Sequence, residues 1–112
     1  MLPLEDGVTG RKNLEGRTFY FQIMRLQNGC VVSISEGKPK LGSLTVSLYN
    51  GSVPVTTQVI PARSANLLAR LAAEKIAIQM NGIAVLSIYV NGDISSDITK
   101  EILKEIDAMI SS

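Results

Sequence analysis

Apolar and polar side chains alternate along most of residues 18–60, a pattern that predicts half-buried β-strands. Four such runs, rich in β-branched and aromatic residues, cover residues 18–26, 30–35, 42–49 and 53–60. Asn28-Gly29 separates the first two runs, and Asn50-Gly51 separates the last two. Because Asn-Gly suits the positive φ values of a two-residue type I′ turn, the pattern predicts two β-hairpins.

The register of two-residue turns assigns each side chain to one of two faces. One face collects mainly apolar residues, and we expect it to form the core: Phe19, Phe21, Ile23, Cys30, Val32, Ile34, Leu44, Val46, Leu48, Val53, Val55 and Val59. The other face mixes polar and apolar side chains, so it is either solvated or packed against another copy of the chain. Our candidates for a dimer or partner interface lie on this second face: Tyr20, Met24, Val31, Ser33, Thr45, Ser47, Thr56 and Gln58.

Beyond the hairpins the apolar spacing changes to nearly four residues, which indicates a helix. That helix is expected to begin at an N-cap at Ser64 and to end near Asn81, with Gly82 suited to the left-handed residue that follows. Residues 83–90 are apolar on both parities, as in a strand inside a sheet. A second helix follows a cap among residues 95–97, and its buried face includes Ile98, Ile102, Ile106 and Ile110.

The predicted element order is therefore β-β-β-β-α-β-α. We expect a two-layer α+β fold, with an antiparallel meander sheet of about five strands and two helices on one face. Residues 1–17 hold several glycines and charges with little periodicity, which predicts a flexible N-terminal arm. The chain of 112 residues has the length of one domain, which we place at residues 18–112.

Composition removes several classes of function. The chain has no histidine and one cysteine, Cys30, which excludes His-based triads, His metal sites and intramolecular disulfides. A formal net charge of +1 supplies no field for nucleic acid or an anionic membrane. No window approaches the roughly 20 apolar residues of a membrane-spanning helix. We therefore expect no cofactor, metal, nucleic-acid or membrane partner, and the low cysteine content fits a reducing, cytoplasmic compartment.

Few side chains could carry catalysis. Thr56 or Thr57 could act as a nucleophile only beside a base such as Lys75 or Glu74, and strand preference explains both threonines more simply. Cys30 has the parity of the core, which favours a packed thiol. No catalytic residue is predicted.

Arg25 is the one charged side chain whose register places it on the apolar face. There it either extends its guanidinium group to water or contacts a partner.

Five short segments follow one another in a distinctive order: FQIMRL at 21–26, LTV at 44–46, VPVTT at 53–57, LARLAAEK at 68–75 and ILKEIDAM at 102–109. In their order and spacing they resemble the small proteasome assembly chaperones. This resemblance implies a non-catalytic chaperone that forms a homodimer, or a heterodimer with a related small chaperone. It further implies binding of a proteasome α subunit during assembly of the α ring.

Two other classes of function remain open. A small adaptor of the roadblock or longin kind also pairs sheets and helices, and scaffolds a GTPase or another protein complex; such folds place a helix before residue 64. An enzyme or small-ligand protein would instead need Thr56, Thr57 and Lys75 around one deep polar pocket.

Overall fold

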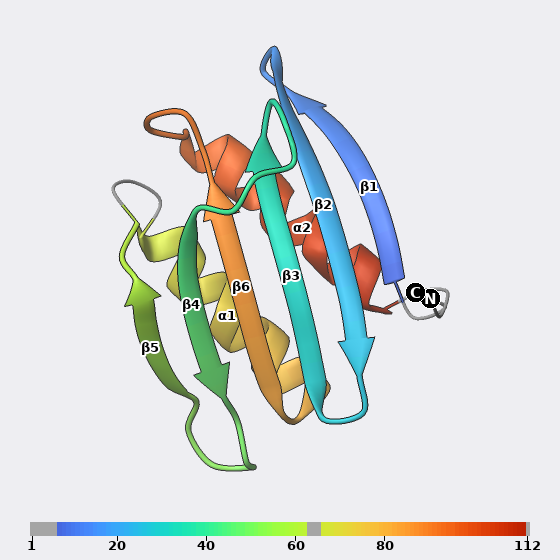
Figure 1. The fold of residues 1–112 in the computed structure, drawn as a ribbon, viewed down its shortest axis with the longest axis vertical. Coiled ribbons are helices and arrows are strands. Elements are labelled where there is room, and N and C mark those ends of the chain that lie inside the picture. Colours follow the sequence, from blue (N-terminus) through green and yellow to red (C-terminus); the bar gives the residue numbers. More distant parts are fainter. Residues whose placement is uncertain (1–6, 63–65, 112) are drawn as a thin grey trace.

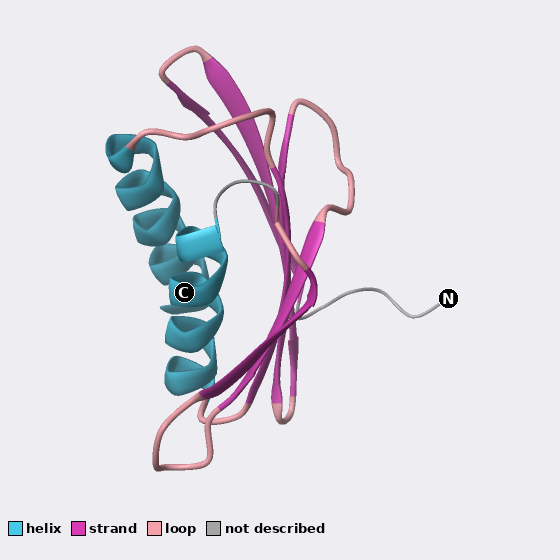
Figure 2. Ribbon diagram, turned by 90° about the vertical axis from the view of Figure 1, so that its left-hand side faces the viewer, coloured by secondary structure: helices cyan, strands magenta, loops and turns pink. Residues whose placement is uncertain are grey.

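The computed structural model describes residues 7–62 and 66–111 of the chain. Its elements are β1 (Gly7–Leu14), β2 (Arg17–Leu26), β3 (Gly29–Glu36), β4 (Ser43–Leu48), β5 (Val55–Ile60), α1 (Asn66–Met80), β6 (Ile83–Tyr89) and α2 (Ser96–Ser111). The strands form one sheet in the order β1-β2-β3-β6-β4-β5 (Figure 1), and both helices lie on one face of it (Figure 2). Neighbouring strands are antiparallel except β3 and β6, which are parallel. The predicted α+β class is confirmed, with a sixth strand and one parallel pair added to the meander.

The N-terminal part of the described chain is an edge strand, whereas we expected a flexible arm through residue 17. Strand β1 pairs along its length with β2, and Glu15 and Gly16 form the turn between them. Both turn residues have positive φ, 54° and 77°, as a type I′ turn requires. The expectation missed this turn because its first residue is glutamate rather than asparagine. Residues 1–6 of the expected arm lie outside the described residues.

Contacts with α2 stabilise β1 in spite of its glycines and charges. Lys12 Nζ lies 3.2 Å from Glu105 Oε2. A Cβ atom on Gly10 would lie 3.5 Å from Met109 Cε, so the strand backbone and the methionine of α2 are close neighbours. The sequence of β1 shows no apolar periodicity that would have predicted these long-range contacts.

The two predicted Asn-Gly turns differ from expectation. Leu26 pairs with Gly29, so the first two-residue turn is Gln27-Asn28. Gly29 already belongs to β3, where a Cβ atom would lie 2.1 Å from the carbonyl oxygen of Ile83, so glycine is needed for the close approach of β6. In the second hairpin Leu48 pairs with Val55, and residues 49–54 form a longer loop.

The helix boundaries agree well with the sequence prediction. Asn81 takes the left-handed conformation after α1, with φ of 51°, and Gly82 N donates to Ala77 O at 3.1 Å. This is the Schellman arrangement, with asparagine rather than Gly82 at the left-handed position. Ser95 caps α2, because its Oγ accepts a 3.1 Å hydrogen bond from Ile98 N. The predicted cap at Ser64 lies outside the described residues.

The core lies between the helices and the covered face of the sheet. Its sheet residues are Phe19, Phe21, Ile23, Cys30, Val32, Ile34, Ala84, Leu86 and Ile88. Its helix residues are Leu68, Ala69, Ala72, Ala73, Ile76 and Ala77 of α1, and Ile98, Ile102, Ile106 and Met109 of α2. The core prediction is therefore right for β2 and β3, and the predicted inner strand at residues 83–90 is β6, between β3 and β4.

The core prediction is wrong for β4 and β5. The expected core residues of this hairpin are not buried: Leu44, Val46, Leu48, Val53, Val55 and Val59. Thr45 and Ser47 face the helices instead, because they pair with Leu86 and Ala84 of β6. The prediction treated the two hairpins as neighbours, whereas β6 separates them. Pairing with β6, and not the local turn, decides which parity of β4 meets the helices.

Arg25 connects β2 to the end of α2. Its Nη2 group donates a 2.6 Å hydrogen bond to the carbonyl oxygen of Met109 and a second one to that of Ile110. A cation at this position satisfies terminal carbonyl groups and complements the negative end of the helix dipole. Arg25 therefore stabilises the helix end, and neither expected role, extension to water or a partner contact, describes it.

Arg17 and Glu36 form a partly buried ion pair, which we call the Arg17–Glu36 clamp. It joins β2 and β3 to the loop before α2. Arg17 donates to both carboxylate oxygens of Glu36, at 2.9 and 2.7 Å. It also donates to the carbonyl oxygens of Asn91 and Asp93, at 3.0 and 2.8 Å. Glu36 Oε1 in turn accepts a 2.8 Å hydrogen bond from Asn91 N. These bonds position the start of α2 relative to the sheet.

Replacing Glu36 by glutamine tests the clamp through its pH dependence. The hydrogen bonds from Arg17 lower the pKa of Glu36 below its ordinary value. Such a group stabilises the fold above its unfolded pKa of about 4.3, and that stability is lost as pH falls through the lower folded pKa. We expect Glu36→Gln to reduce the free energy of unfolding by about 1–3 kcal/mol at neutral pH, and the difference to vanish in acid. Denaturant titrations over a pH series measure both quantities.

Glu101→Gln is the matched control, because the ion pair of Glu101 with Lys104 is 3.7 Å long and more exposed. Equal losses in the two variants, or no loss in Glu36→Gln, would contradict the role given to the clamp.

Candidate functional site

The face of the sheet away from the helices, called the open face below, is the strongest candidate for a functional surface. Two rows of side chains cross it, each running through directly paired residues of neighbouring strands. The first row is Met24, Val31, Val85, Val46 and Thr57, and the second is Leu26, Gly29, Ile83, Leu48 and Val55. Neither row holds a charged side chain.

The apolar members of these rows form one continuous surface, which we call the apolar patch: Met24, Leu26, Val31, Val46, Leu48, Val55, Ile83 and Val85. Several of its members are strongly exposed, including Leu48 at 45% and Val55 at 67%. Isolated exposed apolar residues are ordinary, but a contiguous group on a sheet face marks an interaction surface.

The loop of residues 37–42 lies over the opposite end of the open face and crosses in front of β6 (Figure 1). Lys40 Nζ lies 4.3 Å from the centre of the Tyr89 ring, and Gly42 N donates to Ser87 Oγ at 3.0 Å. Ser35 and Ser87 are buried although they belong to the open face. The loop therefore covers the open face at that end of β3 and β6, and leaves the apolar patch uncovered.

A shallow hollow of about 420 Å³ lies beside the patch on β1, β2 and β3. Thr9, Gln22, Met24, Val31 and Ser33 contribute to its lining, which holds no charged residue. Three of the predicted interface residues, Met24, Val31 and Ser33, therefore surround one concave site.

The eight predicted interface residues do not share a face. Tyr20, Met24, Val31 and Ser33 lie on the open face, whereas Thr45, Ser47, Thr56 and Gln58 lie on the helix-covered side. The expectation of a single surface is wrong for the second group, for the reason given for the core of β4 and β5. An interface role for the open-face group stays a prediction.

Sequence reasoning also missed most of the apolar patch. It assigned Val46, Leu48 and Val55 to the core and left Ile83 and Val85 without a face. One signal for the patch was present in the sequence. Residues 83–90 are apolar at both odd and even positions, which indicates a strand that is covered on both faces of the sheet.

Polar residues of β4, which the sequence placed on the other face, form a buried strip beneath α1. Ser47 and Thr45 are both fully buried, at 0% exposure. Thr56 Oγ1 donates to Glu74 Oε2 at 2.9 Å and lies 3.0 Å from Ser47 Oγ. Because the Thr56 proton goes to the carboxylate, Ser47 is the donor to Thr56. Within residues 7–62 and 66–111, Thr45 Oγ1 has no hydrogen-bond partner.

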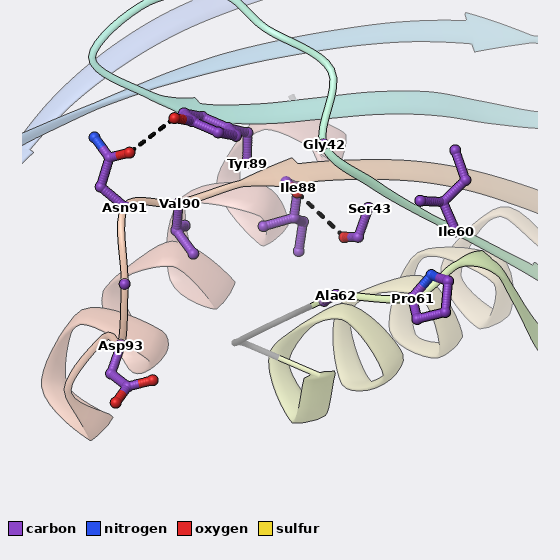
Figure 3. A pocket seen from close by; sticks show the side chains of 11 residues that line it. Gly42, Ser43, Ile60, Pro61, Ala62, Ile88, Tyr89, Val90, Asn91 and Asp93 are labelled. Carbon is purple, nitrogen blue, oxygen red and sulfur yellow. Dashed lines mark hydrogen bonds between the residues drawn. The ribbon is translucent and has the colours of Figure 1, made fainter.

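A cavity of about 610 Å³ opens between the end of β5 and the loop that follows β6 (Figure 3). Ser43 Oγ donates to Ile88 O at 3.2 Å, and Tyr89 Oη donates to Asn91 Oδ1 at 2.8 Å. Asp93 is the one carboxylate among the described residues of the lining, which contains no lysine, arginine or cysteine. The described lining residues therefore do not supply the paired acid and base of a catalytic site.

Of the two candidate bases for Thr56, Glu74 does lie beside it, at 2.9 Å on the covered side. Thr57 lies on the open face and Lys75 Nζ lies 2.6 Å from Asp107 Oδ2, so Thr56, Thr57 and Lys75 do not surround one pocket. Burial raises the pKa of the Cys30 thiol, partly opposed by Arg25, so the predicted packed thiol is confirmed.

The described part of the chain holds neither a metal-ligand cluster nor a membrane-spanning helix. No group of three or more Cys, Asp or Glu residues within 7–62 and 66–111 could hold a metal ion. Within the same ranges, neither helix has the length and apolar character needed to cross a bilayer.

No protein-family model and no curated protein matches this chain. The fold is nevertheless similar to that of a chain in a solved crystal structure, described as a novel chaperone complex for yeast 20S proteasome assembly, with a TM-score of 0.63. The match covers 93% of this chain and 98% of that chain, at 12% sequence identity. At this identity the likeness establishes a shared fold.

Two neighbouring hydroxyl groups test the placement of β4 beneath α1. Thr45→Val keeps the side-chain shape and removes an unpaired buried hydroxyl, so we expect the free energy of unfolding to stay equal or to rise by about 1 kcal/mol. Ser47→Ala removes a hydroxyl that donates to Thr56, and we expect a loss of about 1 kcal/mol. Denaturant unfolding of both variants measures the contrast. Equal losses in the two variants would contradict this arrangement.

Proposed function

We propose that this chain is a non-catalytic, cytoplasmic assembly chaperone of the small proteasome assembly chaperone family, nearest to its fourth member. Two kinds of likeness support the proposal. The fold matches a chain from a yeast proteasome assembly chaperone complex over nearly the whole of both chains. Short segments between residues 21 and 109 also stand in the order typical of that family. The near-complete match in fold is the observation that carries the proposal.

The proposed chaperone dimerises through the apolar patch. Exposed apolar surface costs about 25 cal/mol per Å² relative to burial, so a contiguous patch favours association. Two β-sheets commonly pack face to face, with apolar side chains of both inner faces interleaved. A second copy or a related chain, presenting a sheet of the same kind, would bury Leu48 and Val55. The helices and sheet edges then stay accessible for a proteasome α subunit.

The element order weighs against the adaptor alternative. Roadblock or longin-like adaptors were expected to place a helix before residue 64. Residues 7–62 contain five strands and no helix in this structure.

Charge substitution in the apolar patch tests the proposed interface. Leu48→Glu with Val55→Glu places two carboxylates on the open face, where both side chains are already exposed, so the monomer should fold normally. An unpaired charge buried in a dimer costs several kcal/mol, so we expect the dissociation constant to rise at least about a hundredfold. Sedimentation over a concentration series, with circular dichroism to verify folding, measures the change.

Leu67→Glu is the control, because Leu67 is exposed to the same degree, at 68%, but lies on α1. It should leave association unchanged. A patch variant that still dimerises, or equal loss of dimer in the control, would contradict the proposed interface. So would a chain that is monomeric when pure and co-purifies with no related small chain.

Purification from native lysate tests the proposed activity. We expect a tagged chain to retain proteasome α subunits and α-ring precursors, quantified by mass spectrometry against an untagged lysate. The patch variant should retain less of them than Leu67→Glu, because the dimer is proposed as the binding form. Absence of α subunits and ring precursors from the wild-type sample would refute the proposal.

A further inference from the structure

The chain contains four Asn-Gly sequences, at 28–29, 50–51, 81–82 and 91–92. Asparagine before glycine can deamidate without an enzyme, because the backbone nitrogen of the glycine can attack the side-chain carbonyl carbon. Glycine lacks a side chain that would obstruct the attack. Since the two reacting residues are the same in all four pairs, large differences between their rates in the native chain come from the fold.

Two of the four pairs are held by backbone hydrogen bonds within packed structure. The Asn28 carbonyl oxygen accepts a 2.9 Å bond from Ile83 N, and Gly29 is buried between β2 and β6. Gly82 is also buried, and its nitrogen, the atom that would attack, donates to Ala77 O at 3.1 Å. Reaction at either pair requires local opening of the fold.

The pair at 91–92 is exposed but anchored through three groups of Asn91. Its backbone nitrogen donates to Glu36 at 2.8 Å, and its carbonyl oxygen accepts from Arg17 at 3.0 Å. Its side-chain oxygen accepts a 2.8 Å bond from Tyr89 Oη, which fixes the amide that would be attacked. The rearrangement of Asn91 that the attack requires must therefore break hydrogen bonds.

The pair at 50–51 has none of these restraints. Asn50 and Gly51 are both exposed, in the loop between β4 and β5. Neither makes a hydrogen bond to the described residues. Nothing lies within 4 Å of the position a Cβ atom on Gly51 would take, and Gly51 has φ of 96°. The backbone here can rotate without breaking a hydrogen bond to the described residues.

We propose that Asn50 is a site of spontaneous deamidation, selected by the fold from four chemically equivalent pairs. The Gly51 nitrogen loses its proton and bonds to Asn50 Cγ, and the side-chain nitrogen leaves as ammonia, which gives a cyclic succinimide. Water then opens the ring at either carbonyl, giving aspartate or isoaspartate. One water molecule is consumed, nothing is oxidised or reduced, and the formal net charge falls by one from +1.

Peptide mapping of the native chain after incubation at mildly alkaline pH tests the proposal. Cleavage after lysine and arginine places Asn50 alone in the peptide 41–63 and Asn28 alone in 26–40, since Pro39 protects Lys38. Asn81 and Asn91 share the peptide 76–100 and are separated by fragmentation. We expect conversion at Asn50 to exceed that at each other site at least about tenfold, because each 1.4 kcal/mol of local opening lowers the rate tenfold.

The chain unfolded in denaturant is the reference, and there the four sites should react at comparable rates. Asn50→Gln is the matched variant, because glutamine would have to form a larger ring. It should remove the main acidic species seen by ion exchange. The proposal is overturned if another site leads in the native chain, or if the native and denatured chains show the same order of rates. Asn50 should also lead in the Leu48→Glu, Val55→Glu variant, in which no second chain covers the loop between these two residues, so failure there cannot be attributed to the proposed dimer.

Discussion

The pairing of β6 with β3 on one side and β4 on the other is the constraint on which the rest of the structure depends. Strand β6 follows α1 in the chain and lies between the β2–β3 hairpin and the β4–β5 hairpin. Its parallel register with β3 sets Leu86 opposite Val32, and its antiparallel register with β4 sets Leu86 opposite Thr45. The side of the sheet that each residue of β4 occupies follows from this one strand.

The outcome reverses the usual arrangement for β4 and β5, with polar side chains inside and apolar side chains outside. Inside, the small side chains of Ser47 and Thr45 meet a helix face built largely from alanine, which lets α1 lie close to the sheet. Outside, Val46, Leu48 and Val55 join Ile83 and Val85 in the apolar patch. The covered face of this hairpin therefore buries few apolar side chains, and its open face presents an apolar surface.

Local signals predicted those parts of the fold that local physics controls. Both helices, the inner strand β6, the packed thiol of Cys30 and the core faces of β2 and β3 all follow from periodicity, capping and parity. The neighbours of β4 could not be predicted, because strand order is a long-range property that no turn encodes. Edge strand β1 was not predicted for a similar reason, because the α2 residues that it contacts are about 90 residues away in the sequence. Of the eight predicted interface residues, four lie on the open face, where an interface stays a prediction, and the other four lie on the helix-covered side because of the same error in parity.

The central claim about function is that another protein chain covers the apolar patch in the working assembly. Side-chain footprinting of the native protein by hydroxyl radicals, at cellular concentration, tests it most directly without any substitution. Leu67 and Val55 are equally exposed in the isolated chain, so each serves as a standard for the other. We expect strong modification of Leu67 and protection of Leu48 and Val55, whereas modification of Leu48 and Val55 in proportion to their exposed fractions of 45% and 67% would contradict the claim.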